Sequence, residues 1–362
     1  MTARRILICM HDFARGGTER IAIGLAKNWT ELGREVTILC GTEEGALRAT
    51  VDARVRLIAL EPKIPRTMLS RFGLGRAMAA HLPALRPDVI FLPGNFHLPL
   101  ANGLRRAAGR ARITLKISNP PLPAGLPSAI GAALFGHFAR GVDGFSVLTA
   151  GSARQMATII ADRPIALLHD PLYVRETATP APRPAMGFNI VWAGRLEPQK
   201  DAALALAAIA ALNKLHPAHL TMLGDGAERR KIAEKIVVMG LRDQVTLAGA
   251  VDQIDPYLPQ ADAFLMTSRY EGQPAVIGEA LFHGAPVVST DCSAMLREVM
   301  TIPQAGRIVT SRAPSDLAAA LLAVCRAPRP PRDMLRALVA PYEPRACAAV
   351  YLDWFDRLVG AR

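Results

Sequence analysis

Short apolar runs alternate with helix-length segments along most of the chain. The first half contains RRILICM, EVTILC, VRLIAL, DVIFLP, ITLKI and GFSVLT, and the second half contains FNIVWAG, LTMLGDG, VTLAGA, AFLMTS and APVVST. Nearly continuous apolar runs of this length are typical of strands that are buried on both faces of a parallel sheet. The intervening segments then form the crossover helices, and the pattern predicts an α/β fold.

The alternation stops once and then restarts, which predicts two domains. The chain has 362 residues, more than the roughly 250–300 at which one core usually divides. TATPAPRPAMG, residues 177–187, is rich in Pro and Ala and is the expected linker. We predict two tandem doubly wound Rossmann-like domains facing a central cleft, at residues 1–178 and 187–342. Residues 343–362 are expected to form a helix that packs back on the first domain.

The charge is concentrated in the first domain. Residues 1–186 hold 24 Lys and Arg against 13 Asp and Glu, whereas residues 187–362 hold 19 against 18. A basic domain indicates an anionic partner, such as a phosphorylated ligand, a membrane surface or nucleic acid. No interleaving of aromatic and basic residues accompanies the charge, so nucleic acid is not expected as a partner.

The cysteines and the first apolar run indicate a cytoplasmic protein. Five scattered cysteines without a C-x-x-C motif are typical of reduced thiols; they are Cys9, Cys40, Cys292, Cys325 and Cys347. The first apolar run ends after five residues at His11, which is too short for a signal peptide. Abundant Ala, Pro and Arg are typical of a GC-rich bacterial genome.

Loops that follow strands of such sheets lead into helix N-termini, where ligands bind. In DFARGGTERIAIGLA, Gly16 and Gly17 allow close backbone approach, and Thr18 is expected to cap the next helix. The free N–H groups of that helix would suit a phosphate. An ordinary strand–helix turn explains the same residues.

A second loop carries two cations. In WAGRLEPQKDAALALAAIAAL, Arg195 and Lys200 flank a turn, and a long helix begins near Asp201. Two cations beside a helix N-terminus form an anion site, because Arg offers a fork of donors and Lys a point charge. The alternative is a pair of solvated surface cations. The turn Gly224-Asp225-Gly226 in LGDGAERRKI precedes another helix and carries little information by itself.

The stretch EGQPAVIGEALFHGAPVV, residues 271–288, places two acids in an otherwise uncharged run. Glu271 lies in a loop, Pro274 marks a helix start, and Glu279 lies more than one turn inside that helix. The two carboxylates therefore reach different parts of one elongated ligand. A carboxylate accepts hydrogen bonds from the vicinal hydroxyls of a ribose or hexose. The alternative is a capping acid and a salt-bridged helix acid.

In combination these motifs are specific. GGTER, GRLEPQKD, LGDGAER and SRYEGQPAVIGEALFHGAPVVSTD, in that order, resemble the retaining glycosyltransferases of family 4, which have the GT-B fold. The resemblance is specific across residues 190–310 and weaker over residues 1–175. It implies a UDP- or GDP-linked sugar donor bound mainly by the second domain and an acceptor bound mainly by the first.

The resemblance also implies roles for these residues. Glu271 would face the transferred sugar, and Glu279 would hold the ribose hydroxyls. Arg195 and Lys200 match the basic pair that holds the donor diphosphate. The glycine loop 16–17 would close over that diphosphate from the first domain.

The rest of the implied donor site lies near the base and the sugar. VTLAGA matches the strand whose following loop meets the base, through backbone groups near Leu247 and Ala248. The sugar pocket would be formed by Gly272, Gln273, Pro274 and Ala275.

One position departs from the family pattern. The family often has a histidine in the loop after the fifth strand of the first domain, near the reactive face of the sugar. Here that loop reads LKISNPP, so Ser118 or Asn119 occupies the position, and we assign the contact to Asn119. His97 in PGNFHLP is the fallback candidate.

The implied reaction is hexose transfer with retention, from a nucleotide sugar to a hydroxyl of a lipid-linked or polysaccharide acceptor in envelope synthesis. No Asp-x-Asp motif is placed to hold a divalent ion, so neither a metal nor another cofactor is expected. ARGGTER lacks the G-x-G-x-x-G pattern of a nicotinamide dehydrogenase. A sugar-nucleotide epimerase and a non-catalytic sugar-nucleotide-binding protein of the same fold remain alternatives.

An uncharged stretch in the basic domain predicts where the protein works. ISNPPLPAGLPSAIGAALFGHFA, residues 117–139, contains four prolines, which exclude a continuous transmembrane helix. An apolar loop and short helix in a basic domain would suit peripheral binding to the inner face of the plasma membrane. In the alternative interpretation, the apolar side chains pack beneath the sheet; these are Ile130, Leu134, Phe135 and Phe138.

Overall fold

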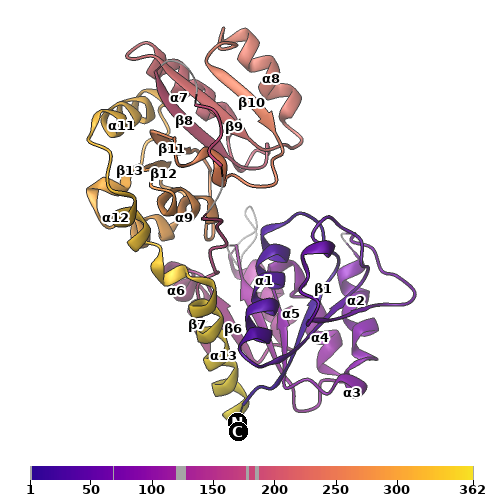
Figure 1. Cartoon of the computed structure of the whole chain (residues 1–362). Helices are drawn as coiled ribbons and strands as arrows, with labels where there is room; N and C mark the ends of the chain where they lie inside the picture. Colours follow the sequence, from indigo (N-terminus) through magenta and orange to yellow (C-terminus); the bar gives the residue numbers. More distant parts are fainter. Residues whose placement is uncertain (1, 68, 120–127, 177–178, 184–186, 362) are drawn as a thin grey trace. The chain divides into compact units, whose positions relative to one another are not determined.

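A computed structural model describes residues 2–67, 69–119, 128–176, 179–183 and 187–361. The chain divides into two compact units, one formed by Met1–Pro171 with Tyr342–Arg362 and one by Leu172–Pro341. Each unit contains one parallel sheet covered by helices (Figure 1). The predicted α/β class with two doubly wound, Rossmann-like domains is confirmed.

The sheet of the first unit has the strand order β3-β2-β1-β4-β5-β6-β7. The strands are β1 (Arg5–Met10), β2 (Glu35–Cys40), β3 (Arg56–Ala59), β4 (Val89–Leu92), β5 (Arg112–Ile117), β6 (Gly144–Val147) and β7 (Ile165–Leu167). The order reverses between β1 and β4, so the switch point, where such sheets bind ligands, lies there. The apolar pattern did not predict β7, a partly exposed edge strand of three residues.

Helices cover both faces of this sheet. One core cluster joins the sheet to α2, α4, α5 and α6 on one face. The opposite face carries α1 and α13, which pack on each other. The helices of this unit are α1 (Gly17–Glu31), α2 (Ser70–Ala79), α3 (Leu82–Leu85), α4 (Leu100–Arg105), α5 (Ser128–Ala139), α6 (Ala150–Ile159) and α13 (Pro344–Gly360).

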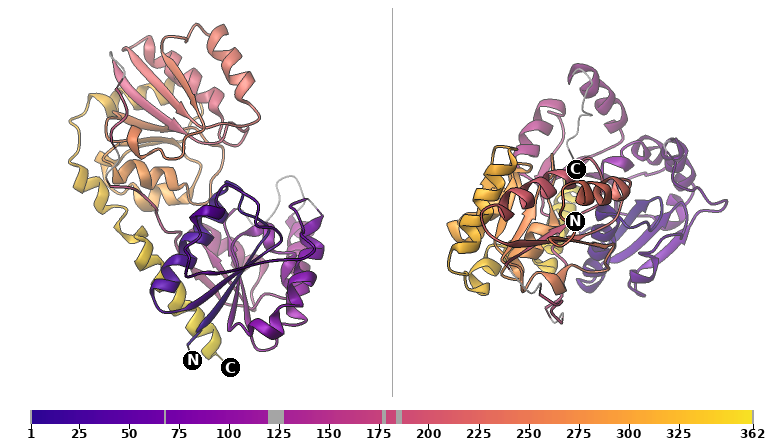
Figure 2. Two further views of the ribbon diagram at one scale, coloured as in Figure 1. Left: turned by 45° about the vertical axis from the view of Figure 1, so that its right-hand side comes forward. Right: turned by 90° about the horizontal axis from the view of Figure 1, so that it is seen from above.

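The C-terminal helix α13 packs through its aromatic side chains. Trp29 of α1 donates a hydrogen bond to the carbonyl oxygen of Ala348 at 3.2 Å. The ring of Trp29 also meets Phe355 edge to face, with 5.2 Å between the centroids. The two chain ends lie side by side in both side views (Figures 1 and 2), and the backbone N–H of Ala3 donates to Asp356. Burial of these aromatic rings fixes the last helix on the first unit.

The sheet of the second unit has the order β10-β9-β8-β11-β12-β13. The strands are β8 (Phe188–Ala193), β9 (Ala218–Leu223), β10 (Val245–Gly249), β11 (Ala263–Met266), β12 (Val287–Thr290) and β13 (Gly306–Val309). Here the switch point lies between β8 and β11. The sequence pattern did not predict β13, because Arg307 interrupts a short edge strand that is only partly buried.

The helices of the second unit enclose an aliphatic core. The long helix α7 packs on α11 and presents alanines and leucines to the sheet. The helices are α7 (Ala202–Asn213), α8 (Arg229–Val238), α9 (Ala275–Phe282), α10 (Ala294–Val299), α11 (Pro314–Arg326) and α12 (Arg332–Ala337).

The chain passes into the second unit before the Pro/Ala-rich segment 177–187. A side chain added at Gly278 of α9 would meet Leu172 at 3.0 Å, so Leu172 packs directly on that helix. The backbone N–H of Arg175 donates to Asp255 at 3.0 Å. These contacts attach residues 172–176 to the second unit. Residues 177–178 and 184–186 of the predicted linker lie outside the described residues.

Candidate functional site

Two loops at the carboxyl ends of β8 and β9 pack backbone against backbone. Gly224 has φ +139°, and a Cβ atom there would lie 1.9 Å from the carbonyl oxygen of Gly194. The N–H of Leu196 donates to the carbonyl of Asp225 at 2.9 Å. Only glycine permits this approach at residue 224, because other residues rarely adopt that φ and would clash. The approach fixes the path of the loop that carries Arg195 and Lys200.

Lys200 and Glu271 form an ion pair at the switch point of the second unit. Lys200 Nζ lies 2.6 Å from Glu271 Oε1, and the two side chains are 18% and 10% exposed. Lys200 ends the loop after β8, and Glu271 lies in the loop after β11. The neighbouring strands therefore bring together two predicted site residues that are far apart in the sequence.

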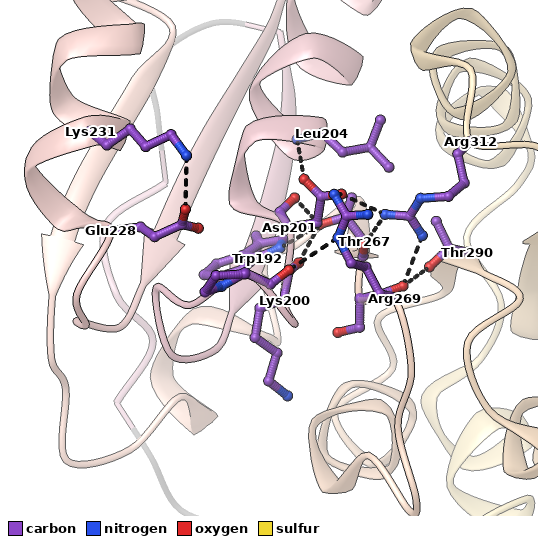
Figure 3. Close-up of polar contacts among 12 residues, drawn as sticks. Trp192, Lys200, Asp201, Leu204, Glu228, Lys231, Thr267, Arg269, Thr290 and Arg312 are labelled. Atoms are coloured by element: carbon purple, nitrogen blue, oxygen red, sulfur yellow. Dashed lines mark hydrogen bonds and ion pairs between the residues drawn. The ribbon is translucent and has the colours of Figure 1, made fainter. Parts of the chain in front are cut away.

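A network of hydrogen bonds holds the backbone beneath Lys200 (Figure 3). The hydroxyl of Thr267 lies 3.0 Å and 2.9 Å from the carbonyl oxygens of Lys200 and Asp201, and it accepts a hydrogen bond from Trp192 Nε1. Asp201 caps α7 through the N–H of Leu204 at 3.3 Å. In Figure 3 the side chain of Lys200 points away from this network.

Asp201 adopts an unusual backbone conformation within the network. Its φ is +47°, which a non-glycine residue rarely adopts. Its carboxylate oxygen Oδ2 accepts from Arg269 and from Arg312, each at 2.8 Å. These two ion pairs offset the cost of the strained backbone and keep the turn before α7 in one conformation.

Sequence reasoning did not find the network residues Thr267, Arg269 and Arg312. Asp201 had one signal, since an Asp directly before a long helix is a typical N-cap. No sequence pattern pointed to Arg312, because it follows β13 and is 111 positions from Asp201. Only the parallel alignment of the strand ends brings it to this loop.

Arg195 lies in the same loop but points to a different partner. Its Nη1 atom lies 2.8 Å from Glu197 Oε1, and its side chain is 65% exposed. An exposed pair of this kind contributes at most about 1 kcal/mol. The guanidinium can therefore leave Glu197 for an anionic ligand at little cost.

The predicted sugar pocket lies in the loop between β11 and α9. The N–H of Glu271 donates to the carbonyl of Cys292 at 2.8 Å, and the Ser293 hydroxyl donates to the carbonyl of Gly272 at 2.6 Å. These bonds tie the loop to the one after β12. Gln273 and Pro274 complete the loop, and the helix begins at Ala275.

Glu279 lies inside α9, as predicted, and its side chain is buried. A buried carboxylate on a helix that begins at the switch point is fixed by its surroundings and is costly to leave without partners. Its predicted contact with ribose hydroxyls stays a prediction.

Leu247 and Ala248 lie within β10, the strand predicted from VTLAGA. Their contact with the base of a nucleotide stays a prediction. The register of β10 against β9 shifts between Leu247 and Gly249, and Ala248 has no partner residue in that pairing. The irregularity arises where Gly249, with φ +80°, turns its carbonyl to the N–H of Gly224.

In the first unit the glycine loop has a different environment from the predicted one. Gly16 is the N-cap of α1, and Thr18 lies inside the first turn, so the predicted Thr18 cap is wrong. A Cβ on Gly16 would lie 2.2 Å from the carboxylate of Glu19, which forms an ion pair with Arg66. Glycine at 16 therefore makes room for a buried acid. Gly17 has open space around it, so a backbone approach by a ligand stays a prediction there.

Asn119 and His97 occupy different environments at the carboxyl edge of the first sheet. Asn95 Oδ1 accepts from the N–H groups of Ser118 and Asn119, at 2.8 Å and 3.2 Å, which ties the loop after β5 to the loop after β4. The side chain of Asn119 is exposed, whereas His97 is buried. Among the described residues, neither ring nitrogen of His97 has a hydrogen-bond partner. Of the two, Asn119 is the residue that a ligand can reach.

Two family models match this chain, one in each unit. The model of the glycosyl transferase 4-like domain matches residues 16–169, and the model of the glycosyl transferases group 1 matches residues 187–327. The first unit thus contains a glycosyl transferase 4-like domain, and the second unit contains a glycosyl transferases group 1 domain. The Lys200–Glu271 pair and α9 therefore lie in the group 1 domain.

Curated relatives match parts of this GT-B chain. An uncharacterized glycosyltransferase of Methanocaldococcus jannaschii is 32% identical over 114 residues, which is 31% of this chain and 28% of the relative. The lipopolysaccharide core biosynthesis glycosyltransferase LpsD of Rhizobium meliloti is 29% identical over 184 residues, 49% of this chain and 52% of the relative. The chain thus spans between about a quarter and half of the length of these relatives.

Solved structures share the fold over the whole chain. Sucrose-phosphate synthase from Thermosynechococcus elongatus has a TM-score of 0.79 at 17% identity, covering 99% of this chain and 100% of that one. HepE of Anabaena in complex with UDP-glucose has a TM-score of 0.71 at 16% identity, covering 98% of each chain. At this identity the likeness shows the GT-B fold alone.

The described residues contain no group of three or more His, Cys, Asp or Glu residues that could hold a metal ion. None of the described helices has the length and apolar character needed to span a bilayer.

His97 gives the GT-B chain a predicted acid sensitivity. Burial lowers the pKa of His97 to about 3, and the positive charges of His11 and Arg66 add to the effect. The unfolded chain binds a proton near pH 6.5, so the free energy of unfolding should fall as the pH drops below that value. We expect a loss of about 1.4 kcal/mol per pH unit between pH 6 and pH 4 from this residue. Urea denaturation of wild type and His97→Gln at pH 7 and pH 5 measures it; equal pH dependence in the two proteins would contradict the assignment.

Proposed function

We propose that the protein is a retaining, metal-independent hexosyltransferase. It moves a hexose-type sugar from a UDP- or GDP-linked donor to a hydroxyl of a lipid-linked or polysaccharide acceptor. The observation that carries the proposal is the Lys200–Glu271 ion pair at the switch point of the group 1 domain. A cation and a sugar-binding carboxylate at one point suit the bond between a diphosphate and a sugar.

The proposed donor site stabilises the leaving group. When the bond from the sugar to the diphosphate breaks, negative charge develops on the phosphate oxygens. The amino group of Lys200 and the loosely paired guanidinium of Arg195 are donors for that charge, carried by one loop. The hydrogen bonds around Asp201 and Thr267 hold the loop in place before the reaction, which is the arrangement that lowers a barrier most.

Glu271 is proposed to bind sugar hydroxyls and not to attack the anomeric carbon. Its carboxylate is already neutralised by Lys200 at 2.6 Å, which makes it a poor nucleophile. Retention then follows from attack of the acceptor on the same face that the leaving phosphate occupies. Glu279 holds the ribose, and the loop 272–275 contacts the sugar.

The acceptor class is supported by the curated relatives. LpsD is named for lipopolysaccharide core biosynthesis, and this chain shares 29% identity with it over about half its length. A sugar hydroxyl on an envelope glycolipid or polysaccharide is therefore the acceptor we propose. Asn119, exposed after β5 in the first unit, is the proposed polar contact near the reacting sugar.

The experiment begins with the donor. A nucleotide sugar that binds only the folded protein should stabilise it by about 2.7 kcal/mol at one hundred times its Kd, and so raise the melting temperature. Sugar transfer from that donor to an envelope lipid fraction is then followed with and without EDTA. We expect transfer to persist in EDTA, with the product in the anomeric configuration of the donor.

Other outcomes would favour other functions. Transfer that stops in EDTA and returns with Mg²⁺ or Mn²⁺ would contradict metal independence. Conversion of the donor to its epimer without an acceptor would identify an epimerase. Stabilisation by a donor without any turnover would identify a binding protein.

A further inference from the structure

The excess positive charge of the first unit comes from one continuous segment. Residues 62–142 contain eleven Lys and Arg and a single acid, Asp88. This segment includes α2, α4 and α5, and none of the three helices contains an acidic residue. The charged side chains within these helices are Arg71, Arg76 and Arg105, so the layer they form is basic and has no acid of its own.

The three helices form a single layer over one face of the sheet. Helices α2 and α4 approach so closely that a Cβ atom on Gly75 would lie 2.4 Å from the carbonyl oxygen of Leu100. Asn102 of α4 donates to the carbonyl of His137 in α5 at 3.0 Å. The side of this layer that faces away from the sheet is thus one continuous surface.

An apolar ridge crosses this surface. The rings of Phe72 and Phe138 lie 5.6 Å apart, joining α2 to α5. Leu134 and Ile130 extend the ridge along α5 at one-turn intervals, and Leu69 extends it at the start of α2. The exposed fractions are 76% for Leu69, 46% for Phe72, 53% for Ile130 and 48% for Leu134.

The alternative interpretation of this stretch is therefore only partly right. Phe135 and Phe138 pack on the core of the first unit, whereas Ile130 and Leu134 face solvent. Residues 120–127 of the uncharged stretch lie outside the described residues.

Cations follow the ridge on both helices. Arg76 lies one turn after Phe72 on the exposed side of α2, and Arg140 is exposed just after α5. Neither forms an ion pair or hydrogen bond with another described residue. A contiguous apolar patch of this kind is uncommon on the surface of a monomeric soluble protein and marks a contact surface.

We propose that this ridge and its cations, from residues 69–76 and 130–140, bind an anionic membrane surface. The apolar side chains enter the boundary between head groups and acyl chains, and the two arginines bind lipid phosphates. A second copy of the chain is disfavoured on this surface, because it would bring two basic layers together. A bilayer that contains anionic lipid offers apolar and negative groups at once.

The inference deepens the proposed function, because it places the enzyme where a lipid-linked acceptor would be. Only this placement beside a lipid-linked acceptor rests on the proposed function. Membrane binding can be measured without any donor or acceptor.

Co-sedimentation with vesicles tests the surface. The full-length protein is mixed with vesicles of phosphatidylcholine, or of phosphatidylcholine with phosphatidylglycerol, at low salt. We expect binding only to the anionic vesicles, and weaker binding as salt is raised. Leu134→Asp should weaken binding about tenfold through lost apolar burial. Arg76→Glu with Arg140→Glu should weaken it at least about thirtyfold.

Matched variants on the second unit are the controls. Val238, on α8, is 87% exposed, and Val238→Asp repeats the apolar-to-acid change away from the surface. Arg230→Glu on the same helix repeats a charge reversal. Both should bind vesicles as wild type does, and all variants should keep the wild-type melting temperature.

Three results would overturn the inference. The first is equal binding to neutral and anionic vesicles, and the second is unchanged binding by Leu134→Asp and by the double arginine variant. The third is a dimer in solution that Leu134→Asp dissociates, which would assign the ridge to a second copy. A melting-temperature shift with a nucleotide sugar, measured on the same variants, reports on the donor site separately. If the protein does not bind anionic vesicles but a nucleotide sugar still raises its melting temperature, the membrane inference is wrong and the proposed function still stands.

Discussion

Replacing Lys200 by alanine is expected to lower the rate of sugar transfer by about 10²–10³-fold, with the fold intact. Removing one preorganised donor to developing negative charge typically costs that much. The side chain is largely buried against Glu271, so removing it should also lower the melting temperature, and the rates are compared at a temperature where the variant is folded. The measurement is release of the nucleoside diphosphate from the donor in the presence of the acceptor fraction. Arg195→Ala should act in the same direction, because both cations belong to one loop.

A matched control lies at the other end of α7. Lys214 is exposed at the C-terminal end of that helix, and Lys214→Ala should leave turnover unchanged. Near-normal turnover in Lys200→Ala would remove the basis of the diphosphate assignment.

A double variant separates direct contact from neutralisation of Glu271. Lys200→Met with Glu271→Gln removes both charges and keeps the approximate side-chain volumes. If Lys200 binds the diphosphate, the double variant should stay as inactive as Lys200→Met. Recovery of activity would show instead that Lys200 serves only to compensate the carboxylate.

Gly224→Ala is expected to destabilise the second unit by about 3 kcal/mol. Alanine rarely adopts φ +139°, and its Cβ would lie 1.9 Å from the carbonyl oxygen of Gly194. The backbone of one loop would have to move, and the loop that carries Lys200 would move with it. Hydrogen exchange of peptides from residues 187–327 measures the loss and separates it from the first unit.

Gly240→Ala provides the comparison. Gly240 follows α8 in the same unit with φ +67°, and open space surrounds the position of its Cβ. The free energy of unfolding of this variant should fall by only about 1 kcal/mol, because alanine is strained at this positive φ but its Cβ meets no other atom. Equal losses in the two variants would show that the approach to Gly194 is unimportant.

The sequence by itself determined the fold class and most of the strands. Nearly continuous apolar runs such as ILICM and FNIVWA, alternating with helix-length segments, are typical of strands buried on both faces of a sheet, so they predict parallel strands without any tertiary information. The short edge strands β7 and β13 were missed, because a strand that is exposed on one side needs no continuous apolar run. The positions of Glu271 before a helix and of Glu279 inside it were also predicted, because Pro274 marks the helix start between them.

Only the tertiary structure decided which residues meet. Lys200 and Glu271 are 71 positions apart, and a single ion pair at 2.6 Å joins them because β8 and β11 are neighbours in the sheet. The order of the strands also brings Arg312 to Asp201 and Gly194 to Gly224. The sequence also could not predict the environment of Gly16, because Glu19 is held there by Arg66, a residue 47 positions away. Periodicity reports which side of an element is buried, whereas the order of strands in a sheet determines which loop ends become neighbours.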